Sequence, residues 1–236
     1  FGHVLGLVDH YDTSYGYFTF GLGVYDTMAS GSYNNNMNTP PLFSAFERAE
    51  LAWLDYDILD NNADSITMIP NLASSNKAFR VSVPGKDNEF FVLENRIQSG
   101  FDTYLPGQGM LVWHIDQDKD AWEKNIVNID PQHQRVDIVE ADGIQSEATR
   151  SGDTFPGFAG ITQYELKSWD GSSLVSFDDV TLDGDTAQLL LAGTAFSMPA
   201  PATVDVTDIA DSSFVFSWAA VEHAKYYDVS VYLSLI

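Results

Sequence analysis

The sequence contains no cysteine and few basic residues. Its 236 residues include 11 Lys and Arg against 34 Asp and Glu, which gives a formal net charge of -23 at pH 7. Without cysteine there are no disulfides and no thiolate ligands, so any zinc site must use histidine and carboxylate. The scarcity of basic residues argues against nucleic acid and anionic membranes as partners, because neutralising phosphates requires clustered Lys and Arg.

Long apolar runs are also missing, since no stretch approaches the ~20 residues of a membrane-spanning helix. The composition is nevertheless that of a globular protein, with 44% hydrophobic and 13% aromatic residues. A chain of this length holds either one large domain or one domain with a small companion. The acidic surplus suits an extracellular protein kept soluble by its charge, with bound divalent cations or halophilic adaptation as further interpretations.

The first nine residues contain a histidine, a glycine and an aspartate at a spacing of three, namely His3, Gly6 and Asp9. Preceded by His-Glu, this segment would read H-E-F-G-H-V-L-G-L-V-D. That is the extended HExxH signature, in which two histidines on one helix face bind Zn²⁺ and the glutamate acts as general base. Gly6 allows the helix to end in a left-handed turn, after which Asp9 would return to the ion that His3 binds. We therefore expect one zinc ion, His3 and Asp9 as two of its ligands, and a sequence that begins inside the motif.

A second block, D-T-M-A-S-G-S-Y, runs from Asp26 to Tyr33. A methionine in a tight turn beneath the zinc is the other hallmark of the extended-motif peptidases, and Met28 would be that residue. The hydroxyl of Tyr33 lies just after the turn and is a candidate to stabilise a developing oxyanion. No other catalytic residue is expected in this chain.

A helix is expected to follow, with Thr39 as its N-cap and apolar residues at helical spacing over 42–53. In gluzincin-type sites the third ligand is a glutamate from a later helix, which makes Glu50 the alternative third ligand, with Glu47 beside it. The other interpretation of both residues is a solvated helix face or an ion pair with Arg48.

The remainder predicts mostly strands. Runs at 78–83 and 89–94 flank the turn residues Pro84–Asn88 and predict a hairpin. Further strands are expected at 109–115 and 135–140, with at least two more within 174–191 and a short helical turn at 118–124.

Together with the N-terminal blocks, four later segments resemble the M6 family of secreted bacterial zinc metallopeptidases, of the immune-inhibitor-A type. They are F-V-L-E-N-R at 91–96, G-M-L-V-W-H-I-D at 109–116, H-Q-R-V-D-I-V-E-A-D-G at 133–143 and G-D-T-F-P-G at 152–157. Val8 departs from the family, which commonly has proline there, and the His-Glu pair is missing. The resemblance implies an α+β, metzincin-like zincin domain that is β-rich after the Met-turn, secretion, and hydrolysis of peptide bonds in protein substrates by zinc-activated water.

The last part of the chain changes composition at M-P-A-P-A, residues 198–202. Strand patterns at 204–206, 213–218 and 226–232 resemble the first strands of a fibronectin type III sandwich, on the strength of Trp218 and the tyrosines of the third run. Such a sandwich needs about 100 residues, so this one would be truncated. The expected organisation is therefore a C-terminal portion of a catalytic domain at 1–194, a Pro/Ala linker at 195–202 and sandwich strands at 203–236.

The remaining ionisable residues carry weaker signals. We expect His10 to face outward because Asp9 occupies the ligand position, and His114 and His133 to have structural roles. Acidic loop clusters suit structural Ca²⁺ or are simply solvated turns. They are Asp55-Asp57-Asp60, Asp116-Asp118-Asp120, Asp178-Asp179 and Asp183-Asp185.

Three functions remain open at this point. The first is part of a secreted zinc endopeptidase, inactive by itself for want of the first histidine and the general base. The second is a degenerate homologue that has lost the metal. The third is a non-catalytic β-rich adhesion or glycan-binding module, in which the fibronectin-like strands contact a surface or a glycan.

Overall fold

The structure is a computed structural model that describes residues 1–15, 21–59, 66–192, 204–210 and 213–218. The chain divides into two compact units, Phe1–Ala195 and Phe196–Ile236. The linker expected at 195–202 and the third sandwich strand expected at 226–232 lie outside the described residues.

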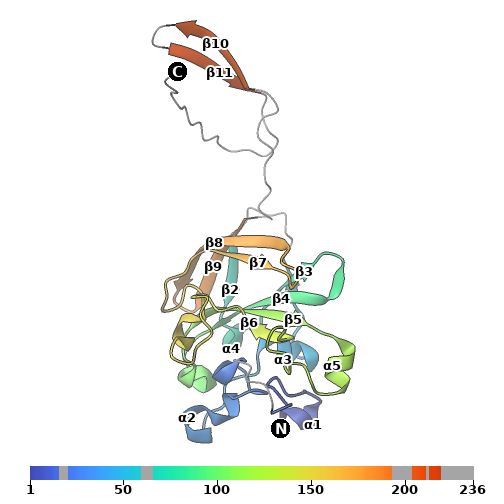
Figure 1. The fold of residues 1–236 in the computed structure, drawn as a ribbon. Coiled ribbons are helices and arrows are strands. Elements are labelled where there is room, and N and C mark those ends of the chain that lie inside the picture. Colours follow the sequence, from blue (N-terminus) through green and yellow to red (C-terminus); the bar gives the residue numbers. More distant parts are fainter. Residues whose placement is uncertain (16–20, 60–65, 193–203, 211–212, 219–236) are drawn as a thin grey trace. The chain divides into compact units, whose positions relative to one another are not determined.

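The N-terminal unit, Phe1–Ala195, is a mixed α+β structure with more strand than helix (Figure 1). Its five-stranded sheet has the order β1-β3-β4-β5-β6, with β1 parallel to β3 and the other neighbours antiparallel. Its strands are β1 (Asp57–Ile58), β3 (Phe79–Val83), β4 (Lys86–Arg96), β5 (Gly109–Asp116) and β6 (Val136–Ile138).

The second sheet is four-stranded and antiparallel, in the order β2-β9-β8-β7. Its strands are β2 (Ile66–Pro70), β7 (Tyr164–Lys167), β8 (Ser173–Asp183) and β9 (Thr186–Ala192). The strands expected at 109–115, 135–140 and within 174–191 are thereby confirmed, as is the hairpin formed by β3 and β4.

Two hydrophobic cores lie on opposite faces of the five-stranded sheet. Because side chains alternate along a strand, Phe91 and Leu93 of β4 pack toward the four-stranded sheet, whereas Phe90 and Val92 pack toward the helices. The central strands β4 and β5 are buried on both faces, which explains their nearly continuous apolar sequence. The unit therefore has three layers, with the helix-and-loop layer on the side of the sheet away from β2, β7, β8 and β9 (Figure 1).

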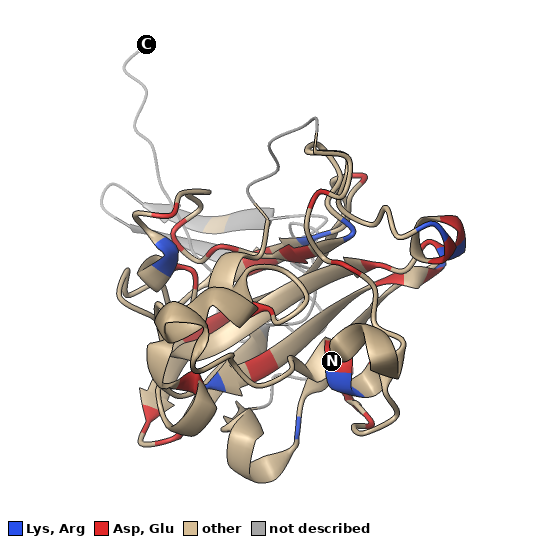
Figure 2. Cartoon of the chain, turned by 90° about the horizontal axis from the view of Figure 1, so that it is seen from below, with Lys and Arg blue, Asp and Glu red and all other residues tan. Residues whose placement is uncertain are grey.

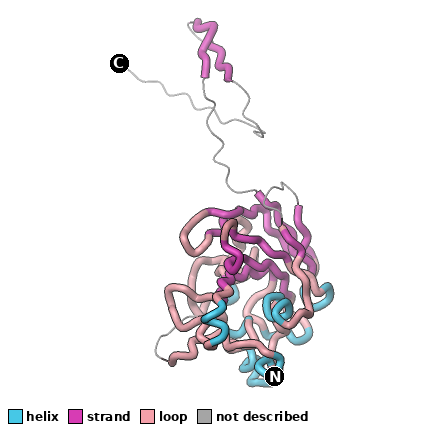
Figure 3. The backbone as a smooth tube through the Cα atoms, turned by 90° about the vertical axis from the view of Figure 1, so that its right-hand side faces the viewer, coloured by secondary structure: helices cyan, strands magenta, loops and turns pink. Residues whose placement is uncertain are grey.

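The third layer consists of short helices joined by long loops, gathered at one side of the unit (Figure 3). Its α-helices are α1 (Gly2–Leu5), α2 (Asn34–Met37), α3 (Ala45–Glu50), α4 (Leu72–Ser75) and α5 (Lys119–Glu123). The 3₁₀ turns of the unit are η1 (Gly23–Tyr25), η2 (Gly31–Tyr33), η3 (Gly100–Tyr104) and η4 (Arg150–Gly152).

Helix α3 begins later than its apolar spacing predicts, and the prediction of Thr39 as its N-cap is wrong. Ser44 is the cap: its hydroxyl accepts from the Glu47 amide at 3.1 Å, and its own amide donates to Glu47 Oε2 at 2.6 Å. This reciprocal pair is a capping box. The two prolines at 40 and 41 lie before the helix instead of in its first turn.

In the second unit, β10 (Val204–Ala210) and β11 (Ser213–Trp218) form an antiparallel pair. The run at 204–206 and the run at 213–218 are thus strands, as expected. In the described residues no helix is both long and apolar enough to cross a membrane. Acidic residues recur on many elements of the chain, as Figure 2 shows.

Candidate metal centre

Helix α1 carries His3 and ends in the left-handed turn expected at Gly6, whose φ is 107°. The Gly6 amide bonds to the His3 carbonyl at 3.1 Å, and the Leu7 amide bonds to the Gly2 carbonyl at 3.1 Å. An L side chain at Gly6 would be strained in this conformation. The turn reverses the chain, so that Asp9 returns to the face of the helix that His3 occupies.

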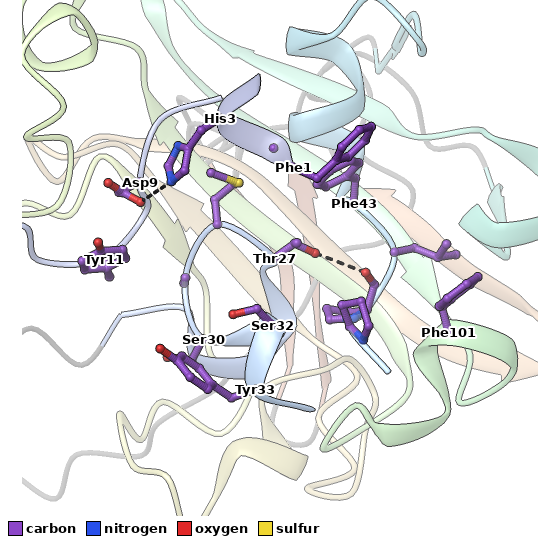
Figure 4. Close-up of a pocket in the computed structure, with 16 residues that line it drawn as sticks. Phe1, His3, Asp9, Tyr11, Thr27, Ser30, Ser32, Tyr33, Phe43 and Phe101 are labelled. Carbon is purple, nitrogen blue, oxygen red and sulfur yellow. Dashed lines mark hydrogen bonds and ion pairs between the residues drawn. The ribbon is translucent and has the colours of Figure 1, made fainter. Parts of the chain in front are cut away.

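His3 and Asp9 point toward one another, with Nε2 of the imidazole 3.0 Å from Oδ1 of the carboxylate (Figure 4). The His3 side chain is 60% exposed, whereas that of Asp9 is only 14% exposed. The two side chains are therefore in direct contact at the protein surface, as close as the metal-ligand expectation for His3 and Asp9 requires.

The other nitrogen of His3 fixes which tautomer faces Asp9. Nδ1 lies 3.0 Å from the Leu7 carbonyl oxygen, which can only accept, so we assign the ring proton to Nδ1. Nε2 then meets the carboxylate either as part of an imidazolium or with its lone pair directed at a cation. A ligand histidine in proteins usually donates its second N–H to a carbonyl in this way.

Asn125 holds the carboxylate in place. Its amide oxygen accepts from the backbone N–H of Asp9, and its Nδ2 donates to Asp9 Oδ2, both at 2.7 Å. Oδ1 is left for the His3 side. Asn125 comes just after helix α5 and lies 116 residues after Asp9 in the sequence. No local sequence pattern could therefore reveal this contact.

Met28 lies beneath α1 and is 6% exposed. A Cβ atom added at Gly2 would come within 2.2 Å of its sulfur, so the thioether packs directly on the helix backbone. The amide of His10 donates to the Met28 carbonyl at 3.0 Å, which joins the Met-containing turn to the residue after Asp9. The methionine therefore supports the helix and segment that carry the two candidate ligands.

His3 and Asp9 lie at the edge of a cavity of about 910 Å³ that is open to solvent. Figure 4 shows His3, Asp9 and Tyr11 on one side of it, with Phe43 and Phe101 on the other. The lining is mainly apolar and aromatic, which suits the side chains of a peptide or another partly apolar ligand.

Two tyrosines line the same cavity. Tyr33, the oxyanion candidate, is 64% exposed and lies near Ser30 and Ser32 (Figure 4). Tyr11, which the sequence did not indicate, has its pKa raised to about 12 by a hydrogen bond to Tyr15, by burial and by the charge of Asp9. Its phenol is therefore protonated beside the carboxylate at neutral pH.

Glu50, the alternative third ligand, does not line the cavity. It is exposed and its Oε1 accepts from Gln117 Nε2 at 2.6 Å. Glu47 is fully buried, so its interpretation as a solvated residue is wrong. Arg48, the partner expected for it, instead donates to the carbonyl oxygens of Phe43 and Leu72 and to Asn76.

His10 does not face outward as expected, since only 1% of the residue is exposed. Its Nδ1 lies 2.9 Å from Asp26 Oδ2, and the ring packs 5.9 Å from that of Phe46. The sequence neighbours of His10 could not reveal this, because both partners come from other segments.

His114 and His133 do not line the cavity, and both stack on Trp169, at centroid distances of 4.6 and 4.5 Å. His114 Nε2 is 3.0 Å from Glu89 Oε1, and burial lowers its pKa to about 4. His133 Nε2 is 2.8 Å from Asp116 Oδ2. These contacts are those of packing residues.

The acidic loop clusters do not converge on one point in the described residues. Asp116 faces His133 and Asn88, Asp118 caps helix α5, and Asp120 pairs with Lys124. Asp60 lies outside the described residues. Within the described ranges, the group of three or more metal-ligand side chains whose donor atoms come together is His10, Asp26 and Glu47.

Comparison with models of known protein families and with curated proteins finds no match for this chain.

Proposed function

We propose that this chain is the C-terminal part of the catalytic domain of a secreted, zinc-dependent endopeptidase of the M6, metzincin-like type. The observation that carries the proposal is the approach of His3 Nε2 to Asp9 Oδ1 within 3.0 Å, on a helix end supported by Met28. The strands of the second unit are proposed to begin an appended fibronectin type III-like module that contacts a surface or a glycan.

The two side chains suit zinc by chemistry and by spacing. Zinc in proteins binds imidazole nitrogen and carboxylate oxygen at about 2.0–2.2 Å, so two of its ligand atoms can lie about 3 Å apart. With the ring proton on Nδ1, an unprotonated Nε2 would have its lone pair free to bind the cation on the side where Asp9 Oδ1 lies. When bound, zinc lowers the pKa of a coordinated water to about 7 and polarises the scissile carbonyl.

In this proposal, the residues of this chain would bind the peptide substrate and orient the zinc ligand Asp9. Asn125 holds Asp9 by two hydrogen bonds, so that Oδ1 keeps its direction. The aromatic side chains of the cavity would receive the side chains of a peptide substrate. Tyr33 is the candidate to donate its hydroxyl proton in a hydrogen bond to the carbonyl oxygen of the peptide as charge develops there.

Two parts of the proposed machinery are not among the residues that line the cavity, which include one histidine and one carboxylate. The proposal assigns the first histidine ligand and the general base to a His-Glu pair directly before Phe1. With only two ligands at this exposed site, the 236 residues alone are expected to bind Zn²⁺ weakly there and to hydrolyse no peptide bond.

The decisive test is the identity of the two residues encoded immediately before Phe1, together with the activity of a longer form that includes them. His-Glu and chelator-sensitive hydrolysis of casein, abolished by His3→Ala, would support the proposal. A different pair would make the chain a degenerate homologue, and caseinolysis by the 236 residues alone would overturn the assignment of roles.

Zinc binding by the present chain offers a second test. His3→Ala and Asp9→Asn should both weaken the exposed Zn²⁺ site in a competition titration. His133→Ala is the matched control, because it removes an imidazole that also faces a carboxylate but lies elsewhere. Equal zinc affinity in the wild type and in both site variants would count against the ligand roles.

A further inference from the structure

We propose that His10, Asp26 and Glu47 form a second, buried site for a divalent transition-metal ion, behind the Met-turn. This buried triad is distinct from the His3–Asp9 pair. It does not depend on the peptidase proposal, since it stands on its own contacts and charges.

The triad joins three separate segments of the helix-and-loop layer. His10 follows the candidate ligand Asp9, Asp26 begins the turn that contains Met28, and Glu47 lies in the first turn of α3. One donor atom from each residue lies within 4.8 Å of the other two. His10 Nδ1 and Asp26 Oδ2 are in direct contact, at 2.9 Å.

All three side chains are removed from water. Asp26 and Glu47 have no exposed surface and His10 has 1%. Glu47 Oε2 accepts from the Ser44 amide, but Glu47 Oε1 is buried without a hydrogen-bond partner. A buried carboxylate oxygen without a donor is costly, and this unsatisfied atom is an independent sign that a ligand of positive charge belongs beside it.

The charges around the triad also favour a bound cation. Near the triad, the carboxylates of Asp26, Glu47, Glu94 and Asp102 all have no exposed surface. The one arginine that is equally buried, Arg96, donates to Glu94 and Asp102 at 2.6–3.0 Å. Asp26 and Glu47 are thus left without a bound side-chain cation among the described residues other than the imidazole of His10.

A divalent ion would neutralise these two carboxylates. The alternative is a proton: burial, followed by the charge of Asp26, raises the pKa of Glu47 well above its usual value. A protonated Glu47 would then face the Asp26 carboxylate. The two explanations differ in whether metal is bound, and experiment can separate them.

The donor set selects the kind of ion. One imidazole nitrogen and two carboxylate oxygens suit zinc or manganese, whereas Ca²⁺ and Mg²⁺ prefer oxygen ligands alone. Separations of up to 4.8 Å exceed the spacing of neighbouring ligands around zinc, so the side chains would draw together slightly on binding. Zn²⁺ is therefore the probe of choice.

The test uses the 236-residue protein with the exposed pair removed by His3→Ala and Asp9→Asn. After refolding with Zn²⁺ and desalting, elemental analysis should find one zinc per chain. Adding Glu47→Gln should cause most of this zinc to be lost. Adding Glu50→Gln, on the same helix but exposed, is the matched control and should leave the zinc content unchanged.

A second measurement needs no change in the triad. X-ray absorption at the zinc edge of the His3→Ala, Asp9→Asn protein should show one imidazole in a shell otherwise made of oxygen, at about 2.0–2.2 Å. A protein that desalts free of zinc, or a shell without imidazole, would overturn the proposal and assign the site to a proton.

Discussion

Asn125 binds both the backbone and the side chain of Asp9, through two hydrogen bonds of 2.7 Å. The two residues are far apart in the sequence but fix one carboxylate in one orientation. Groups that orient a metal ligand from behind change affinity without touching the ion, and their loss typically costs 10- to 100-fold.

Replacing Asn125 by Asp should therefore weaken zinc binding at the exposed pair by roughly 10- to 100-fold. The new side chain has no N–H to donate to Asp9 Oδ2 and sets a second negative charge beside it. A competition titration with a chromophoric chelator measures the change. The matched control is Asn88→Asp, because the side-chain amide of Asn88 donates in the same way to Asp116 Oδ1, at 2.7 Å, and neither residue lines the cavity. Equal losses of zinc affinity in both variants would contradict the prediction.

Met28 packs beneath α1, so its removal should destabilise the protein. Met28→Ala leaves a cavity and should lower the free energy of unfolding by about 2–5 kcal/mol. Met28→Leu conserves volume and should cost less than about 1.5 kcal/mol. Urea unfolding followed by tryptophan fluorescence measures both, and a tolerated alanine would mean that the sulfur does not support the helix.

The carboxyl group of Asp153 should make stability fall as the pH rises. Burial, aided by the charge of Glu140, raises its pKa to about 8, and neither of its buried oxygens has a hydrogen-bond partner. The unfolded group titrates near pH 3.9, so between about pH 4 and 8 the folded state binds the extra proton. This contribution is complete below pH 4 and is lost by about pH 8.

Asp153→Asn removes that titration. Relative to the wild type, the variant should gain stability as the pH increases from about 4 to 8, in urea unfolding measured at intervals across that range. Parallel curves for the two proteins would show that the folded-state pKa is not raised.

The opposite sign is expected for His114. Its pKa is lowered to about 4, mainly by burial, whereas the unfolded imidazole titrates near 6.5. The unfolded state then binds more protons between these values, so stability is complete above about pH 6.5 and is lost as the pH falls toward 4. His114→Gln, which can still donate to Glu89, should flatten this part of the urea-unfolding profile; an unchanged slope would contradict it.

Local patterns predict the elements of this chain better than the contacts among them. The strands appear as apolar runs because β4 and β5 are buried on both faces, and Gly85, with φ of 76°, supports the turn before β4. Ser44 and Glu47 have the spacing of a capping box and so mark the beginning of α3, whereas the apolar periodicity predicts an earlier start.

The contacts of the candidate site also differ in how far the sequence predicts them. His3 and Asp9 lie on one short helix and the turn that follows it at Gly6, so the contact between their side chains follows from local geometry. The contact of Asn125 with Asp9 and the burial of His10 against Asp26 depend on long-range packing. No periodicity within a segment records which distant segment will lie against it.

The bond from the His10 amide to the Met28 carbonyl has a mechanical consequence. The peptide bond between Asp9 and His10 is held by the loop that contains Met28, and this loop lies beneath helix α1, which carries His3. A shift of the backbone between Asp26 and Gly31 would therefore also move the backbone of Asp9 and His10 relative to helix α1.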